Sequence, residues 1–241
     1  MLTILACGGS GTRMAPATRF INKHLLPVGY GDLMIDLPLQ FLADHQFDEI
    51  TIVTGSTHAT QICEYVGDGE KWGFTRVEYT FQPKPLGIAD VLNRVCHKDI
   101  SDGVLLLLGD NYFSNLQGVG LHFIPGFAYV WEYDCGDVEK AKAFGQVIRD
   151  GNDKPASIVE KPKVPTHSKI LTGLYYFPAS VFDVVKCLEP SQRGELEITD
   201  LIKTYLERER LHVLQVEGQW ADLGEHDAWA NFVAGRFEDH G

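Results

Sequence analysis

The chain has little that points to an extracellular or membrane-spanning protein. Its five cysteines are odd in number and scattered. They form no Cys-x-x-Cys pair, which excludes a disulfide framework and favours reduced thiols in the cytoplasm. No apolar run approaches the roughly 20 residues that cross a bilayer, and the first residues lack the basic segment of a secretory signal. The nine histidines show no metal-ligand spacing.

Basic residues are also in deficit. The 21 Lys and Arg residues face 33 Asp and Glu residues, a net charge of -12. This excess of negative charge argues against a surface that binds nucleic acid or an anionic membrane. An anionic substrate would therefore have to be held locally, by a few cationic side chains and metal ions. The 241 residues, 44% of them hydrophobic, are enough to bury the core of one α/β domain.

A glycine-rich loop follows the first apolar run. Residues 8–13 read Gly-Gly-Ser-Gly-Thr-Arg directly after residues 2–6. Glycines tolerate a positive φ and let backbone N–H groups approach an anion, while Arg13 and Lys23 can supply the positive charge that a triphosphate needs. The loop lacks the Gly-Lys-Ser/Thr end of a Walker loop, and Met14 replaces the third glycine of a dinucleotide loop. Alone, the same residues would fit an ordinary surface turn.

Apolar runs and amphipathic patterns alternate along the first half of the chain. They predict strands over residues 2–6, 49–54, 77–81 and 104–108, and helices over residues 34–45, 57–66 and 88–96. This alternation predicts an α/β fold with three Rossmann-like layers around a mixed, mainly parallel sheet. From residue 126 onward we expect strands near 127–133, 146–149, 157–160 and 171–177 with little helix between them, as a small added β layer.

Two aspartates follow elements that end near the expected ligand edge. Asp110 comes directly after the apolar strand 104–108, and Asp222 precedes Gly224 and a terminal helix. Mg²⁺ is commonly held by one or two carboxylates together with substrate phosphates, so this pair would suffice. Singly, Asp110 could cap a loop and Asp222 a helix, but beside a phosphate loop the metal interpretation is favoured.

These motifs together resemble the sugar-1-phosphate nucleotidyltransferase family, most closely its glucose-1-phosphate thymidylyltransferase branch. The resemblance rests on motifs that run in the family's order along nearly the whole chain: GGSGTRM with Lys23 and LLPV, QPKPLG at 82–87, LGDN at 108–111, EKP at 160–162, TGLY at 172–175, RGELEITD at 193–200 and WADLG at 220–224. The RGELEITD motif favours the thymidylyl branch of the family over the uridylyl branch.

The resemblance implies a single nucleotidyltransferase domain over residues 1–241, with a nucleotide-binding half of about 1–125 and a sugar-binding half of about 126–241. It implies that the phosphate of glucose 1-phosphate attacks the α-phosphorus of dTTP, with Mg²⁺ as the metal, to give dTDP-glucose and pyrophosphate. Nucleic acid and membrane are not expected partners, whereas a homo-oligomer is. Because longer members continue into helices that help to form a secondary nucleotide site, we expect weak or no feedback inhibition through such a site.

Residue roles follow by the same resemblance. The catalytic residues would be Arg13, Lys23, Asp110, Lys161 and Asp222, with Asp110 and Asp222 as the metal ligands. The nucleotide would be bound by Gly8, Gly9, Ser10, Gly11, Thr12, Arg13, Gln82, Gly87 and Asp110, with Gln82 and Gly87 reading the base. The sugar phosphate would be bound by Lys23, Asn111, Gly145, Glu160, Lys161, Thr172 and Arg193.

Several of these assignments have alternatives. Gln82 could merely close a strand, Glu160 and Lys161 could form a solvated ion pair, and Arg193 could lie near the phosphates or at a subunit contact. Another nucleotide (UTP or CTP), another sugar 1-phosphate, or a non-catalytic nucleotide-sugar sensor would also carry many of these residues.

The chain also departs from the family. Cys7 replaces an alanine, which predicts a site sensitive to thiol reagents. Leu223 and Glu225 replace threonines beside the second aspartate, and Phe144 replaces the tyrosine before Gly145. Asp32 and Leu33 replace a Lys-Pro pair. These departures leave the predicted reaction type unchanged but weaken the case for glucose as the sugar.

Overall fold

The structure is a computed structural model that describes residues 1–9, 11–98, 100–114, 116 and 123–238. The chain folds as a mixed α/β protein with a large, mostly parallel sheet and small antiparallel sheets, which confirms the predicted fold class. Its contacts separate two compact units. One contains residues 2–85, 106–120 and 218–241, and we call it the loop unit; the other contains residues 1, 86–105 and 121–217, and we call it the hairpin unit. The single-domain organisation stays a prediction.

The loop unit carries the predicted phosphate loop. Its strands are β1 (Leu2–Cys7), β2 (Pro27–Gly29), β3 (Asp32–Leu33), β4 (Glu49–Gly55), β5 (Arg76–Gln82), β7 (Asn111–Phe113) and β13 (Trp220–Asp222). Its helices are α1 (Asp36–Asp44), α2 (Ala59–Val66) and α6 (His226–Glu238), and its short 3₁₀ helices are η1 (Thr12–Met14), η2 (Ala17–Arg19), η3 (Lys23–Leu25) and η4 (Glu70–Trp72).

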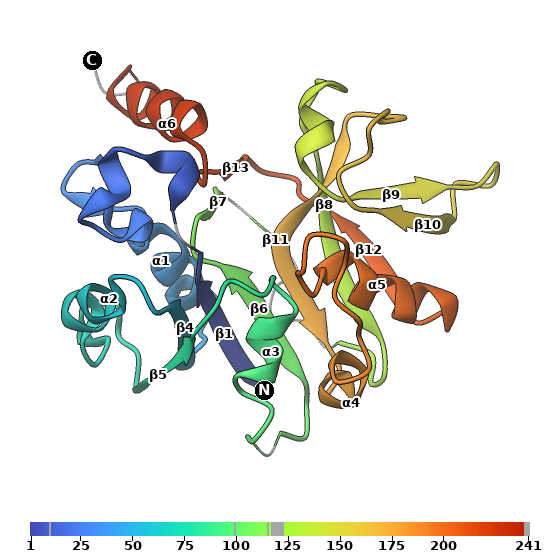
Figure 1. Ribbon diagram of the computed structural model, residues 1–241, viewed down its shortest axis with the longest axis horizontal. Coiled ribbons are helices and arrows are strands. Elements are labelled where there is room, and N and C mark those ends of the chain that lie inside the picture. Colours follow the sequence, from blue (N-terminus) through green and yellow to red (C-terminus); the bar gives the residue numbers. More distant parts are fainter. Residues whose placement is uncertain (10, 99, 115, 117–122, 239–241) are drawn as a thin grey trace. The chain divides into compact units, whose positions relative to one another are not determined.

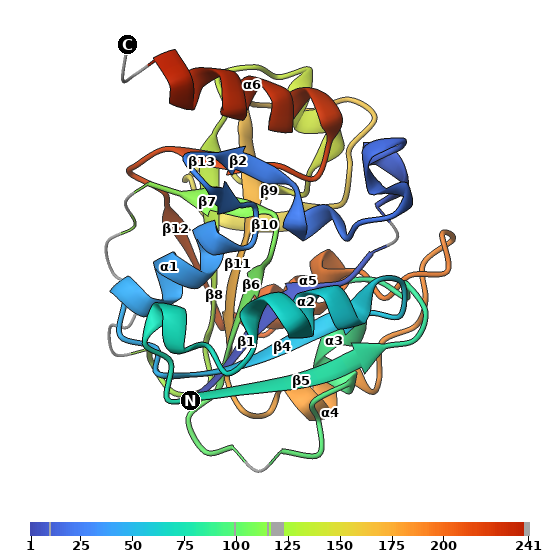
Figure 2. The ribbon, with the colours of Figure 1, turned by 90° about the vertical axis from the view of Figure 1, so that its left-hand side faces the viewer.

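Strands β1, β4 and β5 pair in parallel, and Figure 2 shows them side by side with α2. Parallel strands end at one edge of a sheet, so the loops after β1, β4 and β5 meet there. The run of β-branched and aliphatic residues in β1 and β4 is buried on both faces, as in sheets covered by helices on two sides. This packing fixes the edge at which the glycine-rich loop begins.

The hairpin unit holds most of the remaining strands. It contains β8 (Ala128–Asp134), β9 (Gln146–Arg149), β10 (Pro155–Val159), β11 (Lys169–Phe177) and β12 (Leu211–Gln215), with α3 (Asp90–Asn93), α4 (Val181–Val185), α5 (Ile198–Glu207) and the 3₁₀ helix η5 (Lys140–Ala143). Strand β6 (Val104–Leu108) is divided between the two units at residue 105. Strand β8 pairs antiparallel with β11 and parallel with β12, and β9 and β10 form the small antiparallel sheet that Figure 1 labels.

The expectation of little helix between the strands after residue 126 is confirmed, since the described residues between β8 and β11 contain only the short 3₁₀ helix η5. Helix α5 follows β11 and is not among the predicted elements; it runs for ten residues and buries Ile198, Leu201, Ile202 and Tyr205. These positions recur with helical spacing and form one apolar face, which packs against β10 and β12. The expected helix at 88–96 is shorter than predicted, because α3 covers only Asp90–Asn93. The other expected strands and helices form, with ends that move by a few residues.

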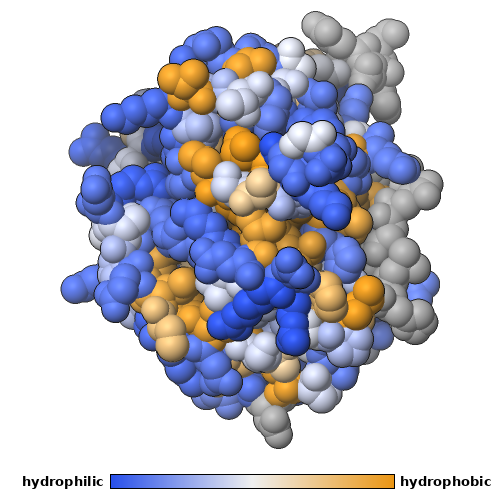
Figure 3. Space-filling model, turned by 90° about the vertical axis from the view of Figure 1, so that its right-hand side faces the viewer, coloured by the Kyte–Doolittle hydropathy of each residue, from blue (hydrophilic) through white to orange (hydrophobic). Residues whose placement is uncertain are grey.

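One face of the protein, shown in Figure 3, is mainly hydrophilic, with apolar residues gathered near its centre. Large apolar side chains that are exposed include Phe20, Tyr30, Leu86, Val138 and Val164. Within the part of the chain that the structure describes, no helix combines the length and the apolar character needed to cross a membrane.

Candidate functional site

The glycine-rich loop begins at the carboxyl end of β1 and lies against β5. A Cβ atom on Gly8 would stand 2.9 Å from Oε1 of Gln82, the last residue of β5. A side chain at position 8 would therefore displace Gln82. Gly55, at the end of β4, approaches the same loop, since its own Cβ would lie 3.6 Å from the backbone nitrogen of Gly9. The structure thus brings Gly8, Gly9 and Gln82 together, while Ser10 lies outside the described residues.

The end of the loop presents Arg13 to solvent. Gly11 has φ +65°, and its carbonyl accepts hydrogen bonds from Thr18 Oγ1 at 2.7 Å and from the Met14 backbone nitrogen at 2.9 Å. This turn starts η1, where Met14 is fully buried while 63% of the Arg13 side chain is exposed. The buried methionine anchors the turn, so the neighbouring guanidinium projects from a fixed backbone.

Asp110 and Asp222 lie together around Gly224. The antiparallel pair of β7 and β13 places Asp222 opposite Asn111, and the Leu223 backbone nitrogen donates to the Asp110 carbonyl at 2.8 Å. A Cβ on Gly224 would lie 2.8 Å from Asp110 Oδ2 and 2.9 Å from Asp222 Oδ1. Two carboxylates that are 112 positions apart in the sequence therefore face the same small residue.

The two carboxyl groups have opposite electrostatic surroundings. Burial alone would raise the pKa of Asp110, but the Lys23 ammonium, 2.5 Å from Asp110 Oδ2, and a hydrogen bond from Asn111 hold that pKa well below its usual range. Burial and the nearby Asp110 carboxylate instead raise the pKa of Asp222 to about 6. Asp222 also accepts a hydrogen bond from the Gly224 nitrogen at 2.8 Å, so it caps the turn before α6 as well.

A divalent cation fits this pair. Uncompensated like charges at close range oppose each other's ionisation, and a bound cation would remove that penalty from Asp222. Among the residues that the structure describes, no cluster of three or more His, Cys, Asp or Glu side chains is suited to a metal. Two carboxylates match an ion that takes its other ligands from water and substrate phosphate, as Mg²⁺ does.

Lys23 is held by its own short helix. Asn22 Oδ1 accepts a hydrogen bond from the His24 backbone nitrogen at 3.1 Å and lies 2.8 Å from His24 Nδ1. Gln61 accepts from the Asn22 nitrogen at 2.8 Å. Burial, with the nearby Lys23 charge, lowers the pKa of His24 to about 3, so this ring is neutral at physiological pH. The network fixes the backbone from which Lys23 reaches Asp110.

Burial of Cys7 contradicts the prediction that the site is sensitive to thiol reagents. Its side chain is completely buried, and a Cβ on Gly109 would lie only 2.6 Å from its sulfur. Burial and the nearby Asp110 raise the pKa of the thiol well above its usual range. Because the thiolate is the reactive form, Cys7 is both shielded and unreactive.

The hairpin unit gathers part of the predicted sugar-phosphate set. Arg193 Nη2 donates to Glu160 Oε1 at 3.3 Å and to Glu197 Oε2 at 2.8 Å, while Thr199 Oγ1 donates to Glu160 Oε2 at 3.2 Å. A Cβ on Gly145 would lie 3.6 Å from Glu160 Oε2. The Arg193 charge is therefore compensated by carboxylates, and its two alternative roles both stay open.

Lys161 belongs to that group, since its Nζ lies 3.8 Å from Glu160 Oε1, whereas Thr172 does not. Lys161 has φ +45°, an unfavourable conformation for a residue with a side chain, and its nitrogen donates to the Phe144 carbonyl at 3.1 Å. Thr172 is buried, and its hydroxyl donates to the Trp131 carbonyl at 3.0 Å rather than to Glu160 or Arg193. The structure does not join Thr172 to the Glu160 group.

Two residues outside the predicted set contact members of it. Trp220 Nε1 donates to Asn111 Oδ1 at 2.8 Å, which orients the amide that in turn donates to Asp110. Glu225 Oε1 accepts from Arg13 Nη1 at 2.7 Å. The sequence marks Glu225 as a departure from the family, but pairing between positions 13 and 225 is set by the tertiary fold.

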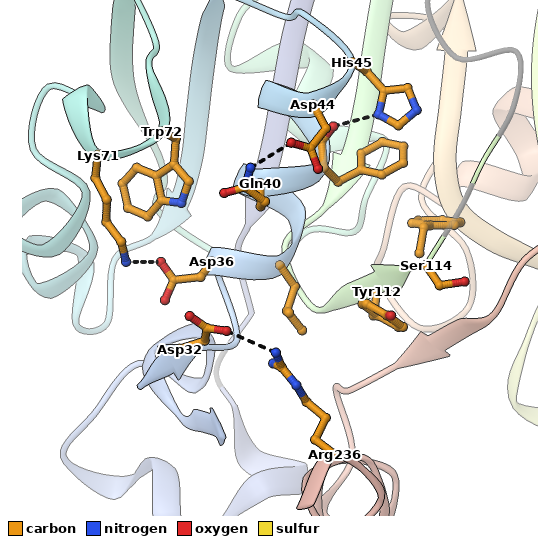
Figure 4. A pocket seen from close by; sticks show the side chains of 13 residues that line it. Asp32, Asp36, Gln40, Asp44, His45, Lys71, Trp72, Tyr112, Ser114 and Arg236 are labelled. Carbon is orange, nitrogen blue, oxygen red and sulfur yellow. Dashed lines mark hydrogen bonds and ion pairs between the residues drawn. The ribbon is translucent and has the colours of Figure 1, made fainter. Parts of the chain in front are cut away.

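A separate pocket of about 480 Å³ lies in the loop unit and is shown in Figure 4. Two ion pairs cross its walls: Lys71 contacts Asp36 at 2.7 Å, and Arg236 contacts Asp32 at 3.1 Å. None of the residues predicted for the site lines it. This pocket is therefore distinct from the predicted catalytic site. Asp32, one of the departures from the family, forms an ion pair with Arg236 of helix α6.

Known proteins share this fold and much of the sequence. A family model described as nucleotidyl transferase matches residues 2–235. A glucose-1-phosphate thymidylyltransferase from Neisseria meningitidis is 35% identical over 241 residues, covering 95% of this chain and 80% of the relative. One from Xanthomonas campestris is 36% identical over 245 residues, covering 95% and 79%.

Solved structures agree. A crystal structure in complex with sucrose, assigned as a glucose-1-phosphate thymidylyltransferase from Bacillus anthracis, has a TM-score of 0.88 and 35% identity, covering 97% of this chain and 94% of the other. A UDP-glucose pyrophosphorylase complexed with UDP-glucose has a TM-score of 0.80, covers 100% of both chains and is 18% identical, so it supports the fold alone.

Proposed function

Since the chain belongs to the nucleotidyl transferase family, we propose that it transfers a thymidylyl group from dTTP to glucose 1-phosphate, giving dTDP-glucose and pyrophosphate. Membership confirms the resemblance drawn from the sequence motifs and makes the chain an enzyme of this type. The relatives named glucose-1-phosphate thymidylyltransferase support the choice of substrates. The observation that carries the proposal is the pair of carboxylates, Asp110 and Asp222, around Gly224 in the unit with the glycine-rich loop.

The chemistry asks the protein mainly to position anions and to stabilise charge. A sugar-phosphate oxygen attacks the α-phosphorus of the triphosphate, the bond between the α- and β-phosphates breaks, and pyrophosphate leaves. Arg13 and the backbone N–H groups of the loop bind the triphosphate and stabilise the leaving group. Lys23, fixed by η3 and paired with Asp110 in the free protein, neutralises charge on the phosphates.

Members of this family generally use a divalent metal, and we propose Mg²⁺ held by Asp110 and Asp222. When bound, such an ion supplies Lewis-acid stabilisation of phosphate charge. The raised pKa of Asp222, about 6, supports a cation at this position because burial and Asp110 disfavour its ionised form.

The remaining predicted residues are proposed to recognise the sugar phosphate and the base. Lys161 and Arg193 supply positive charge for the sugar phosphate, and Glu160 with the backbone at Gly145 binds sugar hydroxyl groups. Gln82 reads the pyrimidine, supported by its contact with the loop at Gly8. Asn111, Gly87 and Thr172 retain the roles that the resemblance implies. UTP, CTP or another sugar 1-phosphate remain the alternative substrates.

The test is pyrophosphate release with Mg²⁺ across five nucleoside triphosphates, each paired with glucose, galactose, mannose and N-acetylglucosamine 1-phosphates. The highest kcat/KM is expected for dTTP with glucose 1-phosphate. A different best pair would keep the reaction type and replace the substrate assignment. Turnover with no pair, by a folded protein that still binds nucleotide, would instead support the nucleotide-sugar sensor.

Asp222→Asn tests the metal assignment without compromising the fold. The amide oxygen can still accept from the Gly224 nitrogen, and removal of the charge relieves repulsion with Asp110. We therefore expect kcat to fall at least about 100-fold while the stability of the metal-free protein is equal or higher. Steady-state kinetics and urea unfolding measure the two effects. Wild-type turnover by this variant would remove Asp222 from the metal site.

A further inference from the structure

The ion pair between Arg13 and Glu225 joins a predicted catalytic cation to a carboxylate that has no assigned role. Arg13 Nη1 lies 2.7 Å from Glu225 Oε1, and the two side chains are 63% and 54% exposed. Both charged groups thus face solvent, where an anionic ligand can reach them. A charge-assisted hydrogen bond to the guanidinium is the kind of contact that a phosphate oxygen would make.

Residues next to both partners pack in one apolar cluster. Met14, next to Arg13, and Leu223, two residues before Glu225, are fully buried in one cluster with Leu26, Val28 and Met34. The Glu225 carbonyl accepts the first hydrogen bond of α6, from the Trp229 nitrogen at 3.0 Å. The backbone at each end of the pair is therefore fixed, and only the exposed side chains have to move for the pair to open.

From this geometry we infer that Glu225 occupies Arg13 in the free protein as an internal competitor of the polyphosphate, and that the pair must open for triphosphate or pyrophosphate to bind. This inference rests on the proposed function, since it takes the phosphate-binding role of Arg13 from it. The free energy needed to open the pair weakens binding of the triphosphate and of the pyrophosphate product equally. Glu225 therefore also favours product release. The threonine that the family carries at this position has no charge with which to compete.

The expected change in polyphosphate affinity is small because the Arg13 and Glu225 side chains are exposed. Exposed ion pairs contribute little and are screened by salt, so the competition amounts to a two- to fivefold change in affinity at low ionic strength. The negative charge of Glu225 near the N-terminus of α6 also stabilises the helix. This second role is structural and does not involve Arg13. The experiment has to separate these two roles.

The measurement is calorimetric binding of inorganic tripolyphosphate to the full chain, without turnover, in a double-mutant cycle. The four proteins are wild type, Glu225→Gln, Arg13→Gln and the double variant, at about 0.05 M and 0.5 M NaCl. We expect Glu225→Gln to tighten binding two- to fivefold at low salt, and less at high salt. In the Arg13→Gln background the same substitution should change affinity by less than about 1.5-fold.

Glu64→Gln is the matched control, because it removes the same charge from an exposed position of α2 in the same unit. Equal tightening by Glu225→Gln in both Arg13 backgrounds, or equal tightening by Glu64→Gln, would mean a general charge effect and would overturn the inference. Unchanged or weaker binding by Glu225→Gln would overturn it too. If wild type binds no tripolyphosphate at either salt, the phosphate-binding loop of the proposed function fails first, and the inference falls with it.

Discussion

At the scale of single residues, Gly224 decides how Asp110 and Asp222 relate. Any larger residue would place a Cβ within 2.9 Å of both carboxylates. The φ of Gly224 is not in the left-handed region, so contact rather than backbone strain explains the need for glycine there. The same two carboxylates acquire different pKa values because Lys23 contacts one and not the other.

Gly224→Ala is therefore expected to impair activity far more than stability. The added methyl group has to displace carboxylate oxygens 2.8 and 2.9 Å away, and displacements of about 1 Å at a reacting centre cost about 100-fold in rate. Steady-state kinetics measures the loss of kcat. Gly235→Ala is the control, since nothing lies within 4 Å of its Cβ position in α6, and it should keep full activity with a small gain in stability. Equal activity of the two variants would contradict the close contact at Gly224.

Cys7 gives a second prediction at this scale. Because the side chain is completely buried while Cys187 is exposed, iodoacetamide should label Cys187 quickly and leave Cys7 unmodified in the folded protein. Mass spectrometry of digested protein measures the labelling of each cysteine. In concentrated guanidinium all five cysteines should react, which controls for detection. Rapid labelling of Cys7 in the folded state, with loss of activity, would contradict its burial.

At the scale of elements, the segment around Gly87 is hydrogen-bonded to Leu196 within the RGELEITD motif. The Leu196 nitrogen donates to the Leu86 carbonyl at 2.7 Å, and the Ala89 nitrogen donates to the Leu196 carbonyl at 3.2 Å. Gly87 lies between these bonds with φ +100°, and its Cβ would stand 2.4 Å from the Leu196 carbonyl oxygen. The two predicted motifs thus support each other within one unit.

Gly87→Ala should accordingly destabilise the protein more than a matched substitution. Backbone strain from a positive φ costs of order 1–3 kcal/mol, and the contact with Leu196 adds to it. Gly136→Ala is the control, because Gly136 has φ +67° in the same unit with nothing within 4 Å of its Cβ position. We expect Gly87→Ala to lower the free energy of unfolding in urea by about 2 kcal/mol more than Gly136→Ala. Equal losses of unfolding free energy in the two variants would show that Leu196 moves away from the added methyl group without an energetic cost.

At the scale of the whole molecule, charge and thiols set the conditions under which the chain works. A net charge of -12 repels polyphosphates at long range, so binding depends on the few cations aimed at them and on bound metal. All five cysteines are free thiols, and the cytoplasmic location stays a prediction.

The homo-oligomer also stays a prediction at this scale. Light scattering after size-exclusion chromatography should return a mass that is a multiple of the 26.9 kDa chain. A single species of 26.9 kDa over a range of protein concentrations would contradict it. Because association depends on concentration, dilution is the appropriate control.

The sequence by itself determined the strands and helices of the first half, since period-two and period-3.6 patterns are local, and it determined the family, since motifs such as GGSGTR are contiguous. It also located Asp110 and Asp222 as candidates by their place after predicted elements. It missed α5, whose apolar face is visible in Ile198, Leu201, Ile202 and Tyr205 but lies inside and beyond a motif taken for a binding segment.

Only the tertiary structure decided what depends on distance between remote residues. Burial of Cys7, the raised pKa of Asp222 and the Arg13–Glu225 pair depend on residues that are far apart in the sequence, and charge interactions fall with distance in space rather than in sequence. A single sequence lists these residues without their separations. The fold supplies the separations, and with them the protonation states and ion pairs on which the proposed chemistry depends.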